Sequence, residues 1–278
     1  MAAITAQEVN KLRQMTGMGM MDCKQALTEA DGDSEKAIEI LRKKGEKISV
    51  KRADNETKEG LVFIYTNADQ TEATIFGLAC ETESVGKNTE FQTLGQKIMD
   101  VAVAEKPADK DALMAAKLED GRTTQEAITE LTGKIGEKVD VVGYSQLSAE
   151  KIVTYLHSNS KIGVLVALQN VNGTDVAEAG KDVAMQITAM RPVALDKDGV
   201  PTDIVEKEIE IGREQARAEG KPEAMLEKIA LGKLNKFYKD NTLLNQEFIK
   251  DNSKTVAQML EGVHKGLTVS AFKRVQIG

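Results

Sequence analysis

The chain has 278 residues, of which 41% are hydrophobic and 29% charged, so it has the composition and length of a globular protein with two or more domains. A net charge of −7 and an aromatic content of 4% exclude nucleic acid as the principal ligand, because phosphates need clustered positive charge and bases need stacking surfaces. Two cysteines, Cys23 and Cys80, predict a reducing compartment without a disulfide framework. No signal-peptide pattern or long apolar run is present, so we expect a cytoplasmic protein.

Residues 1–45 carry the signals of three short helices. Thr5 and Glu8 form a capping box, in which each side chain satisfies a free amide of the first helical turn. The second helix is expected to stop near Asp31–Gly32, and a new cap follows at residues 33–34. These signals predict a three-helix module of a size suited to docking.

The connection between the first two helices is rich in methionine. Gly17 and Gly19 permit backbone angles that other residues resist, so we predict a tight turn that exposes Met18 and Met20. Methionine is flexible and is over-used on surfaces that bind other proteins. The turn is therefore a candidate docking surface, with the alternative that Met20, Met21 and Leu27 belong to the core.

The spacing of apolar residues changes after this module. Residues 46–60 are rich in charge and predict a solvated linker or an extended connection. Residues 61–65 and 73–79 then form two strand-like runs around a turn, which predicts a hairpin. Helical spacing returns over residues 91–103, and a capping box at residues 123–126 starts another helix.

The hairpin-plus-helix pattern recurs later in the chain. Tyr65 and Tyr155 lie 90 positions apart in similar settings, and the helices that follow end before Pro107 and Pro192. This order predicts an internal duplication, which can bury two sheet faces beneath helices. We therefore predict an α+β fold with a duplicated core, whose N-terminal subdomain spans residues 61–140 and whose C-terminal subdomain spans residues 141–278.

The second copy contains an insertion at about residues 202–240. Two helices of similar length flank Gly220 and Pro222, which predicts an antiparallel hairpin of the coiled-coil kind. A structural protrusion and a partner-contacting arm remain equally open, as does dimerisation through this hairpin. A short helix after Thr255 and a closing strand at residues 267–277 complete the chain.

Catalytic motifs are missing from the sequence. The two histidines, His157 and His264, have no neighbours at metal-ligand spacing, and no nucleophile elbow, phosphate-binding loop or dinucleotide fingerprint occurs. We therefore expect no enzyme and no cofactor or metal. One polar cluster, Cys80–Gly86, follows a strand, and Glu81 and Glu83 would share a side if that strand persisted. The alternative is a solvent-exposed turn.

Several stretches across the chain resemble one known family. The chain is similar to the bacterial elongation factor Ts family, the guanine nucleotide exchange factors of elongation factor Tu. The resemblance lies in Ile4–Ala6, Thr16–Leu27, Lys134–Glu137, Lys161–Val166 and Ser253–Val256. It implies a ubiquitin-associated-like helical module, a duplicated core and an inserted antiparallel coiled coil. By position in the family, Arg13, Met20, Met21 and Lys24 would dock on the GTPase domain of elongation factor Tu.

The resemblance also implies a site on the core. A Thr-Asp-Phe-Val motif in the family intrudes near the partner's Mg²⁺ and loosens metal and nucleotide, and it maps to Thr82, Glu83, Ser84 and Val85. A partner-contacting histidine maps to His157. Ser84 replaces the aromatic residue of the family, so a weaker wedge is expected, with more of the coupling carried by docking and the histidine. The alternative function is a helical docking module on a coiled-coil scaffold without exchange activity.

Overall fold

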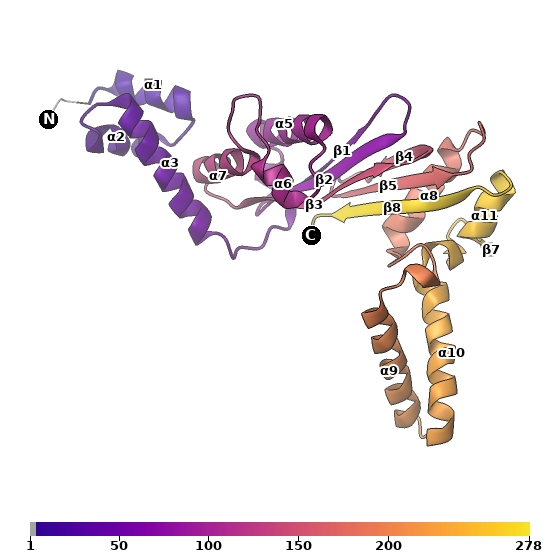
Figure 1. The fold of residues 1–278 in the computed structure, drawn as a ribbon. Helices are drawn as coiled ribbons and strands as arrows, with labels where there is room; N and C mark the ends of the chain where they lie inside the picture. The colour runs from indigo at the N-terminus through magenta and orange to yellow at the C-terminus, as the bar shows by residue number, and fades with distance from the viewer. Residues whose placement is uncertain (1–3) are drawn as a thin grey trace.

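The computed structural model describes residues 4–278 and confirms an α+β fold. A helical unit lies at the N-terminal end, two three-stranded sheets form the centre, and a pair of long helices projects from the opposite end of the core (Figure 1).

The N-terminal unit consists of α1 (Ala6–Thr16), α2 (Met20–Glu29) and α3 (Ser34–Lys51). The predicted capping box between Thr5 and Glu8 is present, because each of these residues accepts a hydrogen bond from the backbone of the other. The three helices close around a small apolar cluster of their own, which gives the unit a separate core. The members of this cluster are Val9, Leu12, Met18, Cys23, Ala26, Leu27, Ala30, Ala37 and Leu41.

Helix α3 runs beyond the predicted end of the module. The helix continues through Gly45 to Lys51, so the prediction of a linker beginning at residue 46 was wrong. Gly45 is used for a close approach, because a Cβ on Gly133 of the neighbouring helix α7 (Thr124–Ile135) would overlap the Gly45 Cα atom. Glycine often ends a helix, but here it lies inside one and allows two helices to cross closely.

The first sheet contains β1 (Glu59–Thr66), β2 (Glu72–Cys80) and β3 (Val139–Ser148), all antiparallel, with β2 in the middle. Its outer face packs against α5 and α7, which surround a large apolar cluster. The helices of this half other than α7 are α4 (Glu83–Gly86), α5 (Thr89–Glu105) and α6 (Lys110–Ala115).

The second sheet repeats this order with β4 (Lys151–Leu156), β5 (Ile162–Gln169) and β8 (Thr268–Gln276), and β5 lies in the middle. Helix α8 (Ala177–Met190) covers it as α5 covers the first sheet. The repeated order of elements is thus confirmed. Smaller elements of this half are 3₁₀ turns at Lys197–Gly199 and Leu243–Asn245, β6 (Glu247–Phe248), β7 (Asp251–Thr255) and α11 (Val256–Val263).

The two sheets pack face to face through a third apolar cluster. Val62 and Ile75 of the first sheet meet Ile152, Leu165 and Val275 of the second, and all five are buried. The order of layers is therefore helices, sheet, sheet, helices, which is the arrangement expected for a duplicated unit that buries one sheet face against its copy.

Strand β3 did not appear in the sequence prediction. It pairs with β2 on both sides of an irregularity at residues 143–144, where Gly143 has a φ of 63°, the left-handed conformation that glycine favours. The first repeat therefore ends after Ser148, and the boundary expected at residue 140 falls inside this strand.

The projecting helices are α9 (Thr202–Ala218) and α10 (Glu223–Asn241), which run antiparallel along each other (Figure 1). They approach most closely where Gly212 faces Ala230. Pro201 occupies the N-cap position of α9, so the helix begins without a side-chain cap. Within residues 4–278, no helix is both long and apolar enough to span a membrane.

Candidate functional site

The turn between α1 and α2 exposes one set of methionines and buries another. Met20 and Met21 are 52% and 73% exposed, whereas Met18 is buried with the core of the three-helix unit, so the prediction that Met18 is exposed was wrong. Gly17 ends α1 with a φ of 66°, which turns the chain back and directs Met18 inward. Arg13 is exposed near this turn.

We name the exposed set Arg13, Met20, Met21 and Lys24 the methionine patch. Met20 and Lys24 lie one turn apart on α2 and therefore share a face of the helix. Exposed methionines flanked by cations form an apolar surface with a positive rim, which suits a protein partner with apolar and acidic groups. The alternative assignment of Met20 and Met21 to the core is excluded by their exposure.

The segment after β2 does not continue as a strand. The strand ends at Cys80, and Glu83–Gly86 forms a single helical turn preceded by Thr82. Glu81 and Glu83 therefore do not share a side: the Glu81 side chain is 17% exposed, whereas that of Glu83 is 71% exposed. The expectation that these carboxylates align along one strand was wrong.

We name residues Thr82–Val85 the β2 exit loop. Glu83 and Ser84 point to solvent, and Val85 is buried and fastens the loop to the core. A hydrogen bond and the positive charge of Lys87, 2.8 Å away, lower the pKa of Glu83. Ser84 Oγ lies 3.0 Å from Thr82 Oγ1, within hydrogen-bond distance. The loop therefore presents an ionised carboxylate and a small hydroxyl on a fixed base.

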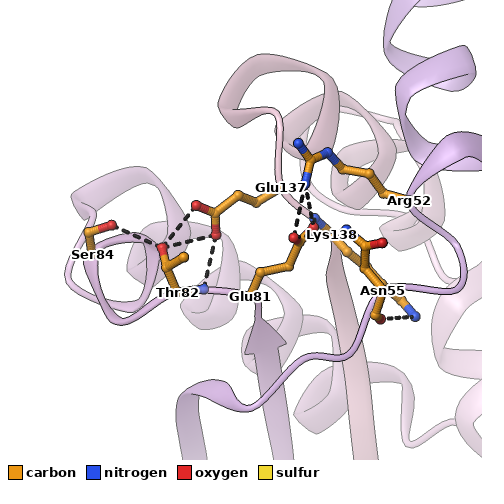
Figure 2. A network of polar contacts seen from close by, with 7 residues as sticks. All are labelled: Arg52, Asn55, Glu81, Thr82, Ser84, Glu137 and Lys138. Carbon is orange, nitrogen blue, oxygen red and sulfur yellow. Dashed lines mark hydrogen bonds and ion pairs between the residues drawn. The ribbon is translucent and has the colours of Figure 1, made fainter.

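The base of the loop is held by two carboxylates (Figure 2). Glu137 accepts hydrogen bonds from the Thr82 backbone N–H at 3.0 Å and from Thr82 Oγ1 at 2.9 Å. Glu81 accepts from Arg52 at 2.9 Å, from Asn55 at 2.9 Å and from the Lys138 backbone N–H at 2.6 Å. We name Glu81 and Glu137 with these donors the carboxylate clamp.

Burial and hydrogen bonding act in opposite directions on Glu81. Burial raises the pKa of its carboxyl group, but the hydrogen bonds from Lys138, Asn55 and Arg52 together outweigh burial and lower the pKa. Glu81 is therefore charged at neutral pH and fully engaged. Sequence reasoning missed the clamp. Its only signal was that Glu137 lies in one of the stretches that carry the family resemblance.

His157 lies at the tip of the β4–β5 hairpin. Its Nδ1 atom is 3.0 Å from the Tyr155 hydroxyl, which orients the ring. The same tip is tied to the first strand, because the Val62 N–H donates to the Ser160 carbonyl at 2.7 Å. Lys161 forms an ion pair with Glu59 at 2.6 Å, and Glu59 is the register partner of the last residue of β2. The structure therefore brings the His157 tip and the β2 exit loop to the same end of the core.

The three-helix unit contacts this end of the core as well. Lys134 of α7 packs against Gly17 of the methionine turn and forms an ion pair with Glu90 in the first turn of α5. Among residues 4–278, no group of three or more side chains is arranged to hold a metal ion. The predicted site residues thus lie on three segments that these contacts connect at one end of the core.

Comparisons with known proteins identify the family of the chain. A family model described as Elongation factor TS matches residues 81–278, which is most of the chain. The chain belongs to the elongation factor Ts family. Elongation factor Ts of Cytophaga hutchinsonii is 64% identical over 277 residues, with 100% of both chains covered. The protein of the same name from Amoebophilus asiaticus is 56% identical with 99% of both chains covered, and that from Christiangramia forsetii is 46% identical with 100% covered. Family membership therefore extends over the helical unit, the core and the projecting helices.

Proposed function

We propose that this chain binds elongation factor Tu in its GDP-bound form and accelerates the release of GDP, so that GTP can bind in its place. The observation that carries the proposal is the β2 exit loop, which holds the Glu83 carboxylate in solvent on a base fixed by Glu137 and Val85. Mg²⁺ requires near-octahedral geometry, so a small displacement of its ligands weakens both metal and nucleotide binding. The process needs no covalent step.

In this proposal the methionine patch supplies docking. The three-helix unit, which we assign to the ubiquitin-associated type, presents Met20 and Met21 to an apolar surface of the partner's GTPase domain, with Arg13 and Lys24 meeting acidic groups at the rim. Flexible methionine side chains adapt to such a surface at low cost. The helical unit therefore anchors the complex without itself contacting the nucleotide.

The His157 tip provides a second contact beside the β2 exit loop, since both lie at the same end of the core. We assign α9 and α10 to an antiparallel coiled coil that extends away from this end (Figure 1). Their distance from the loop favours a separate contact with the partner, or with a second copy of this chain, over a role in releasing GDP.

Release of GDP then depends on the coupling free energy between the binding of GDP and the binding of this chain to elongation factor Tu. If this chain lowers the affinity of elongation factor Tu for GDP, GDP must lower the affinity for this chain by the same factor. The complex of all three is therefore transient, and either ligand can leave first.

The deciding experiment measures release of a fluorescent GDP analogue from elongation factor Tu with increasing amounts of this chain. We expect the rate to rise and then saturate. An unchanged rate at saturating concentration would remove the exchange function and leave the alternative, a docking module on a scaffold without exchange activity.

A substitution separates loosening of the nucleotide from docking. Glu83→Ala removes the exposed carboxylate and is expected to slow GDP release more than it weakens the nucleotide-free complex. Glu119→Ala, which also removes an exposed carboxylate, serves as the matched control and should change neither quantity. Equal losses in rate and affinity for Glu83→Ala would show that the loop only docks.

Substitution of Ser84 tests whether a larger side chain on the β2 exit loop speeds GDP release. The side chain is exposed and small, so Ser84→Phe adds a large apolar group at the tip of the loop without disturbing the core. We expect faster GDP release for Ser84→Phe and little change for Ser84→Ala. A Phe variant no faster than the wild type would show that volume at this position contributes nothing to exchange.

A further inference from the structure

We propose that Glu81 and Glu137 are positioning residues that hold the β2 exit loop at a fixed place relative to the methionine patch. This inference rests on the proposed exchange function and adds a division of labour to it. The loop displaces the metal, the patch docks, and the clamp makes the two act as one body.

Glu81 connects the loop to the helix that carries the docking unit. Arg52, the C-cap residue of α3, donates to both Glu81 oxygens at 3.0 and 2.9 Å, and Asn55 adds a third hydrogen bond (Figure 2). Both of these hydrogen bonds come from the Nη1 atom of Arg52, and the separate donor on Asn55 restrains the orientation of the carboxylate. The end of α3 and the start of the loop therefore move together.

Glu137 connects the same loop to α7. It follows Gly136, the C-cap of that helix, and its carboxylate accepts both hydrogens that Thr82 offers. The backbone N–H of the next residue, Lys138, donates a hydrogen bond to Glu81. The two carboxylates are therefore connected through the short backbone segment from Glu137 to Lys138. The loop is held at its base from two helices rather than one.

The two supporting helices are themselves packed backbone to backbone. At their crossing, Gly45 of α3 faces Gly133 of α7, with no room for a Cβ on Gly133. Lys134, the next residue, packs against Gly17 beneath the methionine turn. A continuous series of contacts therefore runs from the turn, through the helix crossing and the clamp, to the β2 exit loop.

This arrangement has a direct consequence for exchange. When the patch binds its partner, a clamped loop arrives already oriented, whereas an unclamped loop spends most of its time elsewhere. Misplacing a reacting or displacing group by about 1 Å commonly lowers rates by up to about a hundredfold. Loss of the clamp should thus reduce the maximal rate of GDP release and leave docking intact.

The test uses Glu137→Gln and Glu81→Gln in the full chain with elongation factor Tu. Each amide keeps one acceptor but turns an NH₂ donor toward a donor of the protein, which breaks half of the contact. We expect the saturating rate of GDP release to fall by about tenfold, with the half-saturating concentration changed less than twofold. Glu72→Gln is the matched control, because Glu72 pairs with Lys106 at 2.8 Å at the other end of the same strand. It should leave both quantities unchanged.

A second measurement examines the clamp without the partner. Hydrogen exchange of the Thr82 and Lys138 amides in the free chain should be slow in the wild type and faster in Glu137→Gln and Glu81→Gln, respectively. Unchanged protection of these amides, or variants that release GDP at the wild-type rate, would overturn the positioning role alone. So would a fall in rate matched by an equal loss of affinity. Failure of the wild-type chain to release GDP would overturn the proposed function and, with it, this role.

Discussion

Phe63 pairs with Phe76 across the β1–β2 ladder, whereas Val153 pairs with Val166 at the corresponding place in the β4–β5 ladder. The phenyl rings stack with their centroids 5.3 Å apart. Two aromatic side chains therefore fill the space in the first repeat that two smaller valine side chains fill in the second. The helix that covers each sheet has a glycine at this place: Gly95 of α5 packs against Phe63, and Gly180 of α8 packs against Val153. The two repeats therefore share the arrangement of strands and covering helix but differ in the side chains that pack between them.

The two hairpin tips differ in the same way. Asn67 and His157 begin turns with the same backbone hydrogen bonds, and Gln70 and Ser160 both adopt positive φ values, 58° and 55°. The side chain of Asn67 closes its own turn, whereas the partly exposed ring of His157 contacts Tyr155 on the strand beside its turn.

The exits of the central strands complete the comparison. After β5, Glu150 accepts the N–H groups of Asn170, Val171 and Asn172 and holds the chain against the core. After β2, Glu137 accepts hydrogen bonds from Thr82, the next two residues extend into solvent, and Val85 returns to the core. Both exits are therefore held by carboxylates, but from different places in the two repeats, because Glu150 precedes the first strand of its repeat, β4, whereas Glu137 precedes the last strand of its own, β3.

The largest expected effect tests the different filling of the two repeats. Phe76→Ala should lower the free energy of unfolding by about 3–5 kcal/mol, because it empties the fully buried half of the aromatic pair. Val166→Ala, at the equivalent buried position, should cost only about 2 kcal/mol. Denaturant unfolding of both variants measures the difference. Equal losses would contradict the idea that the first repeat depends on its aromatic pair.

A smaller effect is expected at the two helix glycines. An added methyl group at Gly95 or Gly180 would overlap Phe63 or Val153, and such overpacking costs about 1–3 kcal/mol, offset by about 1 kcal/mol of helix propensity. Gly95→Ala should be the more damaging, because the Phe63 ring is stacked and cannot move aside. Thermal unfolding would show this.

The control for these glycines is Gly232→Ala on α10, where an added Cβ meets nothing within 4 Å. This variant should be stabilised by up to about 1 kcal/mol through helix propensity alone. If Gly95→Ala were stabilised to the same extent, the close approach of α5 to Phe63 would be excluded as a determinant of packing.

The hairpin tips should differ in kind as well as in size. Asn67→Ala removes two hydrogen bonds from backbone amides, of 2.8 and 3.0 Å, and should cost about 1 kcal/mol of stability. His157→Ala should change stability by less than about 0.5 kcal/mol but weaken the complex with elongation factor Tu. Calorimetric binding together with denaturation separates the two outcomes. A His157→Ala variant that binds normally would remove this tip from the interface.

The smallest effect concerns pH and two aspartates, one in each half. Hydrogen bonds from Arg122 lower the pKa of Asp120 to about 2, and hydrogen bonds from Ser253 and Lys254 lower that of Asp251 to about 2. Because the unfolded carboxyl binds its proton first, each group stabilises the fold above about pH 4, and this contribution is lost as the pH falls toward 2. Asp120→Asn should flatten the acid limb of the melting temperature against pH.

Asp251→Asn provides the comparison for this acid limb. Its side chain is 43% exposed, against 34% for Asp120, so solvent screens its interactions more strongly. The flattening should therefore be smaller for Asp251→Asn than for Asp120→Asn. The reverse order would show that the ion pair of Asp120 contributes less than the turn around Asp251.

Local sequence signals predicted the local structure well. The capping boxes at Thr5 and Thr123 and the hairpin turns depend on residues within four positions of each other, and all are present. The exposure of Met20 was also predicted from the turn, whereas that of Met21 was implied only by the family resemblance. The burial of Met18 was not predicted, since it depends on the direction that Gly17 gives to the chain.

Features that depend on distant partners were missed. Strand β3 finds its place by pairing with β2, about sixty residues earlier, and its own sequence is interrupted by Gly143. Glu137 meets Thr82 across 55 positions, a contact that no short-range pattern can indicate. The third helix was predicted to end at residue 45 because residues 46–60 are rich in charge, whereas the helix continues through Gly45, which serves the crossing with Gly133.

The position of Gly45 along α3 also fixes how far the methionine patch moves when the crossing rotates. Ser34 begins the helix and Gly45 lies eleven residues later, so the arm from the crossing to the docking unit is about 16 Å long at 1.5 Å per residue. The six residues from the crossing to the end of the helix at Lys51 span only about 9 Å. A rotation that shifts the docking end by about 2 Å therefore shifts the clamped end by about 1 Å in the opposite direction, which is several times the roughly 0.2 Å within which metal–ligand distances are held.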